Sequence, residues 1–203
     1  MLGLQSYFVI SYKVKHHLNF LYPRYKKLNM ELFSWFRDKT SVLVAFSGGV
    51  DSSVVAKVAF DVLKGNAVAA IAISELLPLE ELKHAIKIAR EIGIELIIFE
   101  HKLPEEFYKS KDKKCYYCKK AMMQNIIKIA KDRGIKTIVD GTNKDDLHSH
   151  RPGIKALREL GIRSPLAELG ITKQEVRRLA KELGLSNHDR PSKACSIFNN
   201  DKS

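Results

Sequence analysis

The chain has 203 residues, of which 45% are apolar, 29% charged and 8% aromatic, a composition typical of one globular α/β domain with at most a small appendage. No uncharged apolar run approaches the ~18 residues of a membrane helix, and three cysteines are too few for a disulfide scaffold, so we expect a reducing cytoplasm and no membrane partner. The formal net charge of +12 favours anionic ligands such as nucleotides, while a nucleic-acid partner is less expected but not excluded.

Residues 1–29 contribute part of this positive charge, because they contain five Lys and Arg residues and no acidic residue. We interpret this segment either as a basic N-terminal arm or as an artefact of an upstream start codon, with translation beginning at Met30. The main domain is expected over residues 30–186. Residues 187–203 are expected to be the remnant of a C-terminal region that carries Cys195.

From residue 42 onward, short apolar runs alternate with segments of helical periodicity. Strands are expected at residues 42–46, 67–73, 94–99 and 135–139. Helices are expected at residues 52–64, 79–93, 119–133, 152–160 and 172–184, the last opened by a capping box at Thr172 and Glu175. This alternation predicts an α/β fold, a doubly wound and mostly parallel sheet with helices on both faces. Such sheets bind ligands at the carboxyl ends of their strands.

The loop after the first strand has the composition of an anion site. Its residues are Ser47, Gly48, Gly49, Val50, Asp51, Ser52 and Ser53. Glycines allow close backbone approach to an anion, serine hydroxyls donate to phosphate oxygens, and a helix N-terminus favours negative charge. The spacing fits neither the dinucleotide fingerprint nor the Gly-Lys-Ser/Thr phosphate loop. A glycine-rich turn capped by serines is the structural alternative.

Asp51 would repel a triphosphate unless a cation lies between them. A bridging Mg²⁺ is therefore one interpretation, and a helix N-cap is the other. Both roles are compatible with each other.

Two further loops belong to the same predicted edge of the sheet. Ser74 follows the second strand, and Gly141 and Thr142 follow the fourth strand. Residues of these types form turns about as often as they bind ligands, so we expect either nucleotide binding or a turn at each position.

The cysteines form a pair and a single residue. Cys115 and Cys118 lie among six lysines, and Cys195 also has basic neighbours. Positive charge favours the thiolate, which is the nucleophilic and metal-binding form. A zinc site completed by Cys195 and His188, an iron–sulfur cluster held by three cysteines and a coincidental spacing all remain open. A thioredoxin-like redox pair is disfavoured, because the two cysteines do not follow a first strand. The lysine run is equally compatible with a solvated basic face.

Several motifs together carry a family resemblance between Leu32 and Cys195. They are Ser-Gly-Gly-x-Asp-Ser at 47–52, Cys-Tyr-Tyr-Cys-Lys-Lys at 115–120, Asp-Gly-Thr-Asn at 140–143 with Asp-Asp at 145–146, Arg-Pro-Gly at 151–153, Ser-Pro-Leu at 164–166, Thr-Lys-Gln-Glu-Val-Arg at 172–177 and Pro-Ser-Lys-Ala-Cys at 191–195. With these motifs the chain resembles the LarE-like ATP-dependent sulfur transferases of the PP-loop ATP pyrophosphatase superfamily. These proteins serve biosynthesis of the nickel-pincer cofactor.

The resemblance implies a chemistry. ATP, with Mg²⁺, activates a carboxylate of a pyridinium biscarboxylate mononucleotide as an acyl adenylate, and a sulfur nucleophile then displaces AMP. The family pattern implies that Cys195 is either a sacrificial sulfur donor or, with Cys115 and Cys118, a ligand of a [4Fe–4S] cluster that provides sulfide; three cysteines favour the cluster. It further implies that Arg151 contacts the mononucleotide and that the protein is a homo-oligomer.

The sequence departs from the family after Cys195, where the family's usual continuation is not recognisable. A truncated C-terminal part, or a short homologue completed by another chain, is expected on this basis. Two rival functions stay open. One is tRNA thiolation by a PP-loop enzyme, and the other is a non-catalytic ATP-binding remnant that acts with a partner.

Overall fold

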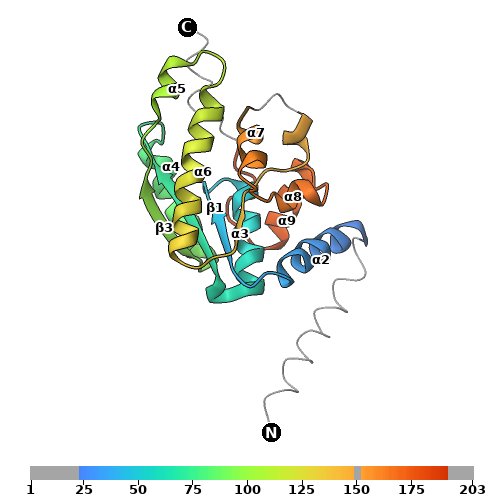
Figure 1. Ribbon diagram of the computed structural model, residues 1–203. Coiled ribbons are helices and arrows are strands. Elements are labelled where there is room, and N and C mark those ends of the chain that lie inside the picture. The colour runs from blue at the N-terminus through green and yellow to red at the C-terminus, as the bar shows by residue number, and fades with distance from the viewer. Residues whose placement is uncertain (1–22, 149–151, 192–203) are drawn as a thin grey trace.

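Four parallel strands form the central sheet in the computed structural model, which describes residues 23–148 and 152–191 (Figure 1). The strands are β1 (Val42–Ala45), β2 (Ala67–Ile73), β3 (Glu95–Glu100) and β4 (Thr137–Val139). Their spatial order is β3-β2-β1-β4, with β1 paired in parallel to both β2 and β4. The chain therefore builds outward from β1 to one edge and then returns to the other side of β1. Parallel strands in this order are the expected doubly wound arrangement, which is confirmed.

The helices connect the strands and cover both faces. They are α2 (Pro23–Arg37), α3 (Val50–Leu63), α4 (Leu79–Ile92), α5 (Glu105–Lys109), α6 (Lys114–Asp132), α7 (Pro152–Glu159), α8 (Pro165–Glu168) and α9 (Lys173–Glu182), with 3-10 turns η1 (Lys64–Asn66) and η2 (Asp145–His148). Within residues 23–148 and 152–191, none of these helices combines the length and the apolar character needed to cross a membrane.

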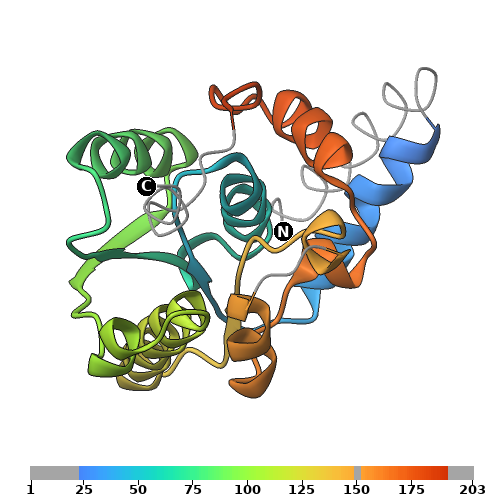
Figure 2. The ribbon, with the colours of Figure 1, turned by 90° about the horizontal axis from the view of Figure 1, so that it is seen from above.

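Apolar side chains alternate between the two faces of the sheet. Val42 and Val44 face the core shared with α2, α3, α4, α8 and α9, whereas Leu43 between them faces the core shared with α6 and α7. Figure 2 shows α3, α4 and α9 on one side of the sheet and α6 and α7 on the other. Because both faces are covered, the central strands are apolar at successive positions rather than at every second one.

The structure differs from the sequence-based expectations at β4, α6 and α2. Strand β4 starts at Thr137 because Ile135 is still engaged in the turn that follows α6, where its N–H donates to the carbonyl of Ala130 at 2.8 Å. Helix α6 begins at Lys114, so the cysteine pair lies on a helix and not in the preceding loop. Helix α2, which was not expected, runs across the proposed boundary at residues 29 and 30. The division of the chain into segments at that point stays a prediction.

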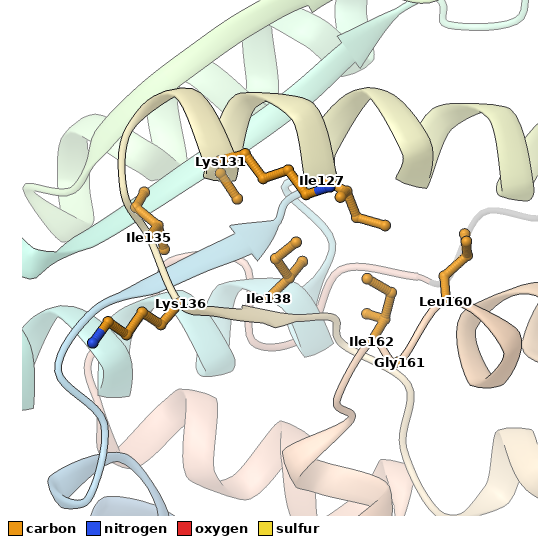
Figure 3. Close-up of a pocket in the computed structure, with 9 residues that line it drawn as sticks. Ile127, Lys131, Ile135, Lys136, Ile138, Leu160, Gly161 and Ile162 are labelled. Carbon is orange, nitrogen blue, oxygen red and sulfur yellow. The ribbon is translucent and has the colours of Figure 1, made fainter.

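An apolar groove of about 240 Å³ lies toward the amino end of β4, between the end of α6 and the turn after α7 (Figure 3). Figure 3 shows the isoleucines Ile127, Ile135, Ile138 and Ile162 lining it. The residue that precedes β4, Lys136, lies at its edge. The groove therefore lies away from the carboxyl ends of the strands, where a sheet of this type binds its ligand.

The glycine after β4 determines how closely two segments approach. A Cβ atom on Gly141 would lie 2.7 Å from the backbone nitrogen of Ser52 at the start of α3. The atoms that this Cβ would meet are backbone atoms of Asp51 and Ser52, so a larger residue could be accommodated only if the backbone moved. The loop after β4 and the N-terminus of α3 are thus in direct backbone contact.

We expect Gly141→Ala to destabilise the protein by about 1–3 kcal/mol, because the added methyl group overpacks this contact. The matched control is Gly65→Ala, since a Cβ at Gly65 has no atom within 4 Å. There alanine lowers the conformational entropy of the unfolded chain, which is expected to stabilise the protein by about 0.4–1 kcal/mol. Urea unfolding of both variants measures the difference. Equal stabilities would contradict the packing constraint.

Candidate active site

The loop between β1 and α3 contains two glycines with different structural roles. Gly48 has a φ of 74°, and a Cβ there would lie 2.6 Å from the Cα of Ala85 on α4. Gly49 has a φ of −72°, and a Cβ there would meet only the Ser47 hydroxyl at 3.4 Å. Glycine is therefore required at position 48 by packing and conformation. At position 49 the fold would accept a side chain, so the glycine leaves room in front of the loop.

The three serines of the loop also differ. Ser47 is exposed, whereas Ser52 and Ser53 are 5% and 0% exposed. The Ser52 and Ser53 hydroxyls donate to the carbonyl of Gly49 at 3.1 and 2.8 Å and so hold the loop against the first turn of α3. The Ser53 backbone N–H donates to the same carbonyl, so the amides at positions 50–52 precede the hydrogen-bond ladder of the helix. These amides and the Ser47 hydroxyl are the donors that the loop offers to an anion.

Asp51 does not cap α3, which corrects the N-cap interpretation. The N-cap residue is Gly49, with no side-chain cap hydrogen bond. The Asp51 carboxylate instead accepts a hydrogen bond from Asn143 Nδ2 at 3.1 Å and forms an ion pair with Lys173. It thereby joins the start of α3, the loop after β4 and the start of α9.

The loop after β4 is braced by two buried polar side chains. Asp140, 6% exposed, accepts hydrogen bonds from the backbone and hydroxyl of Thr142 and from the hydroxyl of Ser164, the two hydroxyls at 2.5 and 2.6 Å. Asn143, 2% exposed, accepts from the backbone of Asp145 and Asp146. The loop is thus held by its own side chains against the start of α8.

The structure gives Ser74 and Thr142 the roles of turn residues. The Ser74 hydroxyl accepts from the backbone N–H of Leu76 at 3.3 Å, and the Thr142 hydroxyl donates to Asp140. Both residues follow strands at the carboxyl edge of the sheet, as expected. Their contact with a nucleotide stays a prediction.

The cysteine pair lies at the start of α6. Cys115 and Cys118 are one helical turn apart, which places them on one face of the helix. The Cys118 sulfur lies 3.8 Å from Nε2 of His101, a residue that is 4% exposed and directly follows β3. Burial lowers the pKa of His101, while a hydrogen bond with the backbone of Cys118 opposes that shift.

His101 was not selected from the sequence, although it follows a buried strand as the other candidate residues do. His188, which was considered as a zinc ligand, lies in the turn after α9, where its carbonyl accepts from Arg177. Among the residues that the structure describes, no group of three or more His, Cys, Asp or Glu side chains is arranged to hold a metal ion. Cys195 and Arg151 lie outside the described residues.

Part of the lysine run is engaged in contacts between α6 and α7. Lys120 donates to the Tyr116 hydroxyl at 2.8 Å and to Glu159 at 3.2 Å, and the Tyr116 hydroxyl itself donates to Glu159 at 2.6 Å. The side of α6 next to the cysteines is therefore joined to α7. At least one member of the run is more than a solvated charge.

Two side chains from distant parts of the chain also contact the loop. Nδ2 of Asn187, a residue 2% exposed, donates to the carbonyl of Gly48 and to the Ser53 hydroxyl, both at 2.9 Å. Nε2 of His84 on α4 lies 3.2 Å from the same carbonyl. Neither residue was selected from the sequence, because nothing in the local pattern indicates that they meet this loop.

Comparison with known proteins places this site in a family context. The family model described as NAD synthase matches residues 35–137. The chain is 43% identical over 166 residues to an uncharacterized protein of Synechocystis sp., covering 81% of this chain and 62% of that protein. It is 37% identical over 169 residues to pyridinium-3,5-bisthiocarboxylic acid mononucleotide synthase of Lactiplantibacillus plantarum, covering 82% of this chain and 61% of that protein. The chain thus spans less than two thirds of the length of these relatives.

Among solved structures, the U34-tRNA thiolase NcsA from Methanococcus maripaludis, with its [4Fe–4S] cluster, is similar with a TM-score of 0.63 and 19% identity. The similarity covers 87% of this chain and 70% of the thiolase and concerns the fold. The resemblance predicted from the motifs is confirmed by the relative from Lactiplantibacillus plantarum.

Proposed function

The chain belongs to the NAD synthase family, and from this premise we propose that it is an ATP-pyrophosphatase-type enzyme that adenylates a carboxylate and then transfers sulfur to it. The observation that carries the proposal is the loop of Gly48 and Gly49 at the start of α3, placed where the strand order reverses between β1 and β4. A crevice at such a reversal is where doubly wound sheets bind nucleotides.

The loop has the chemistry to hold the phosphates of ATP. The amides at the start of α3 and the exposed Ser47 hydroxyl supply donors, and the helix dipole favours the negative charge. A Cβ at Gly49 would meet only the Ser47 hydroxyl, at 3.4 Å, so the glycine keeps a side chain out of the space that the proposal assigns to a phosphate. Held there, ATP would react at its α-phosphate with the substrate carboxylate. A carboxylate oxygen bonds to the α-phosphorus, the bond to the bridging oxygen breaks, and pyrophosphate leaves.

Asp51 fits a Mg²⁺ ion that also binds the phosphates. Mg²⁺ is usually held by one or two carboxylates together with phosphate oxygens and water, and Asp51 presents a carboxylate in the first turn of α3. In the structure both of its oxygens contact donors, Asn143 Nδ2 and the Lys173 ammonium. The proposed role of Asp51 is to hold the cation next to the loop, with Lys173 contributing a second positive charge.

The relative from Lactiplantibacillus plantarum indicates the substrate class. Its name describes a pyridinium bisthiocarboxylic acid mononucleotide as the product. We infer that a pyridinium carboxylate mononucleotide is the substrate here, with Arg151 as a contact for it. Attack of a sulfur nucleophile on the acyl adenylate forms the carbon–sulfur bond, breaks the bond to AMP and leaves a thiocarboxylate.

The sulfur source involves the cysteines. Two thiols one turn apart on α6 fit two of the three ligands of a [4Fe–4S] cluster, and Cys195 is the proposed third. When bound, such a cluster would supply a sulfur nucleophile. Without it, the Cys195 thiolate would attack the acyl adenylate and displace AMP to give a thioester. Cleavage of the Cβ–Sγ bond of Cys195 by β-elimination would then release the thiocarboxylate and leave dehydroalanine at position 195. The lysines beside Cys115 and Cys118 favour the thiolate state that either route requires.

The two rival functions have weaker support. The likeness to the tRNA thiolase concerns the fold, whereas the relative at 37% identity is a mononucleotide synthase. A non-catalytic ATP-binding role would retain the loop but release no pyrophosphate. We also propose that the protein acts in the reducing cytoplasm and assembles as a homo-oligomer.

The first test addresses ATP binding. Gly49→Asp is expected to abolish ATP binding by calorimetry while the protein stays folded, because the backbone accepts a side chain there but the carboxylate would occupy the phosphate position. Gly65→Asp, at a glycine whose Cβ position is open, adds the same charge and is expected to bind ATP as the wild type does. Unchanged affinity in Gly49→Asp would refute the assignment of the loop.

The second test addresses the cation. Asp51→Asn is expected to weaken ATP binding at least about tenfold in Mg²⁺ and much less in EDTA, because the amide is a poorer ligand for a hard cation. The measurement is the dissociation constant in both buffers. Equal losses in Mg²⁺ and EDTA would assign Asp51 a structural role through Asn143 and Lys173.

The third test separates the two sulfur sources. After anaerobic purification, the cluster route requires that Ala at Cys115, Cys118 or Cys195 lowers iron content and sulfur transfer together. Pyrophosphate release is expected to persist in all three, since adenylation precedes sulfur transfer. If only Cys195→Ala stops transfer, and the wild type loses the mass of one H₂S after turnover, the cluster route is wrong and Cys195 is consumed.

A further inference from the structure

The carbonyl of Gly48 accepts hydrogen bonds from two side chains that are remote from it in sequence. Asn187 Nδ2 lies 2.9 Å away and His84 Nε2 lies 3.2 Å away. One donor comes from the turn after α9 and the other from α4. Two independent elements therefore fix the direction of one peptide group in the loop.

Asn187 can make this contact in one orientation only. The carbonyl of Gly48 has no hydrogen to donate, so the amide nitrogen of Asn187 must face it, and the same nitrogen donates to the Ser53 hydroxyl at 2.9 Å. This leaves Asn187 Oδ1 buried with no hydrogen-bond partner in the described part of the chain. A buried polar atom without a partner lowers the stability of the folded state, so a contribution to stability does not by itself explain why an asparagine stands at position 187.

The trans geometry of the peptide bond carries this constraint to the other side of the group. In a trans peptide the C=O and the next N–H point in opposite directions. Because the carbonyl of Gly48 is directed toward Asn187 and His84, the N–H of Gly49 is directed away from them. There it donates a hydrogen bond to the hydroxyl oxygen of Ser47, the exposed serine of the loop, at 3.3 Å.

The two donors are themselves held in place. Burial is the main cause that lowers the pKa of His84, with the charge of Arg190 adding to it, so the neutral ring must carry its proton on Nε2 to donate to Gly48. Arg190 forms an ion pair with Glu81 on α4 at 2.9 Å, which ties the turn that contains Asn187 to the helix that contains His84. Both donors therefore belong to one braced unit.

We propose that Asn187, assisted by His84, is a positioning residue that sets the Gly48–Gly49 peptide so that the Gly49 N–H holds the Ser47 hydroxyl in place beside the phosphates of the bound nucleotide. The inference rests on the proposed function and deepens it. The turn after α9 thereby acts on the phosphate loop 139 residues earlier in the chain. Neither side chain needs to touch the nucleotide.

The test separates positioning from a general loss of structure. Asn187→Asp is nearly isosteric but places a carboxylate oxygen against the carbonyl of Gly48, which should turn the peptide. The expected result is an affinity for ATP and for pyrophosphate reduced about tenfold, with the affinity for adenosine unchanged. Ser186→Ala is the matched control, because it removes the hydrogen bond to Glu91 in the same turn without touching the loop. It is expected to bind all three ligands as the wild type does.

A second pair of variants guards against misfolding of Asn187→Asp. His84→Leu removes the other donor and is expected to show the same phosphate-specific loss, whereas His84→Gln keeps a donor and is expected to restore part of the affinity. Wild-type ATP affinity in both Asn187→Asp and His84→Leu, or equal losses for ATP and adenosine, would overturn the proposal. A wild type that binds no ATP would instead refute the proposed function on which the inference rests.

Discussion

The reversal of strand order between β1 and β4 is the constraint on which the rest of the structure depends. Because β2 and β4 flank β1, the chain leaves β1 toward one side of the sheet and later returns to the other. The loops after β1 and β4 therefore meet at the start of α3. Gly141 permits this meeting, since any side chain there would collide with the backbone of Ser52. The carboxylate of Asp51 then joins both loops to the start of α9.

The charges of the site are arranged around that meeting point. The first turn of α3 presents backbone N–H groups that precede the hydrogen-bond ladder of the helix, at the positive end of its dipole, and the Lys173 ammonium lies against Asp51. The Asp51 carboxylate, which lies nearest the loop, is compatible with an anionic ligand only if a cation or a lysine offsets its charge. The structure contains that lysine, and the proposed chemistry adds Mg²⁺.

The proposed reaction divides between two regions of the same edge. In the proposal, the loop of Gly48 and Gly49 holds the ATP that activates the carboxylate, whereas Cys115 and Cys118, on a helix after β3, take part in the delivery of sulfur. His101 connects this second region to the sheet, because its backbone N–H donates to Ile73 of β2 and its ring lies beside the sulfur of Cys118. A parallel sheet brings such segments to one edge because all its strands end there.

The sequence by itself determined the succession of the four strands and most helices along the chain and the capping box at Thr172 and Glu175, since these follow from local patterns of a few residues. From the same kind of pattern it predicts the loop at Gly48 as an anion site. Helices α2, α5 and α8 were missed, because α5 and α8 are short and α2 lies in a segment without a clear period. Only the tertiary structure decided that Lys173 pairs with Asp51, that His101 lies at Cys118, and that Asn187 and His84 hold Gly48. These contacts join residues from separate elements, and their existence depends on strand order and helix packing, which no local pattern encodes.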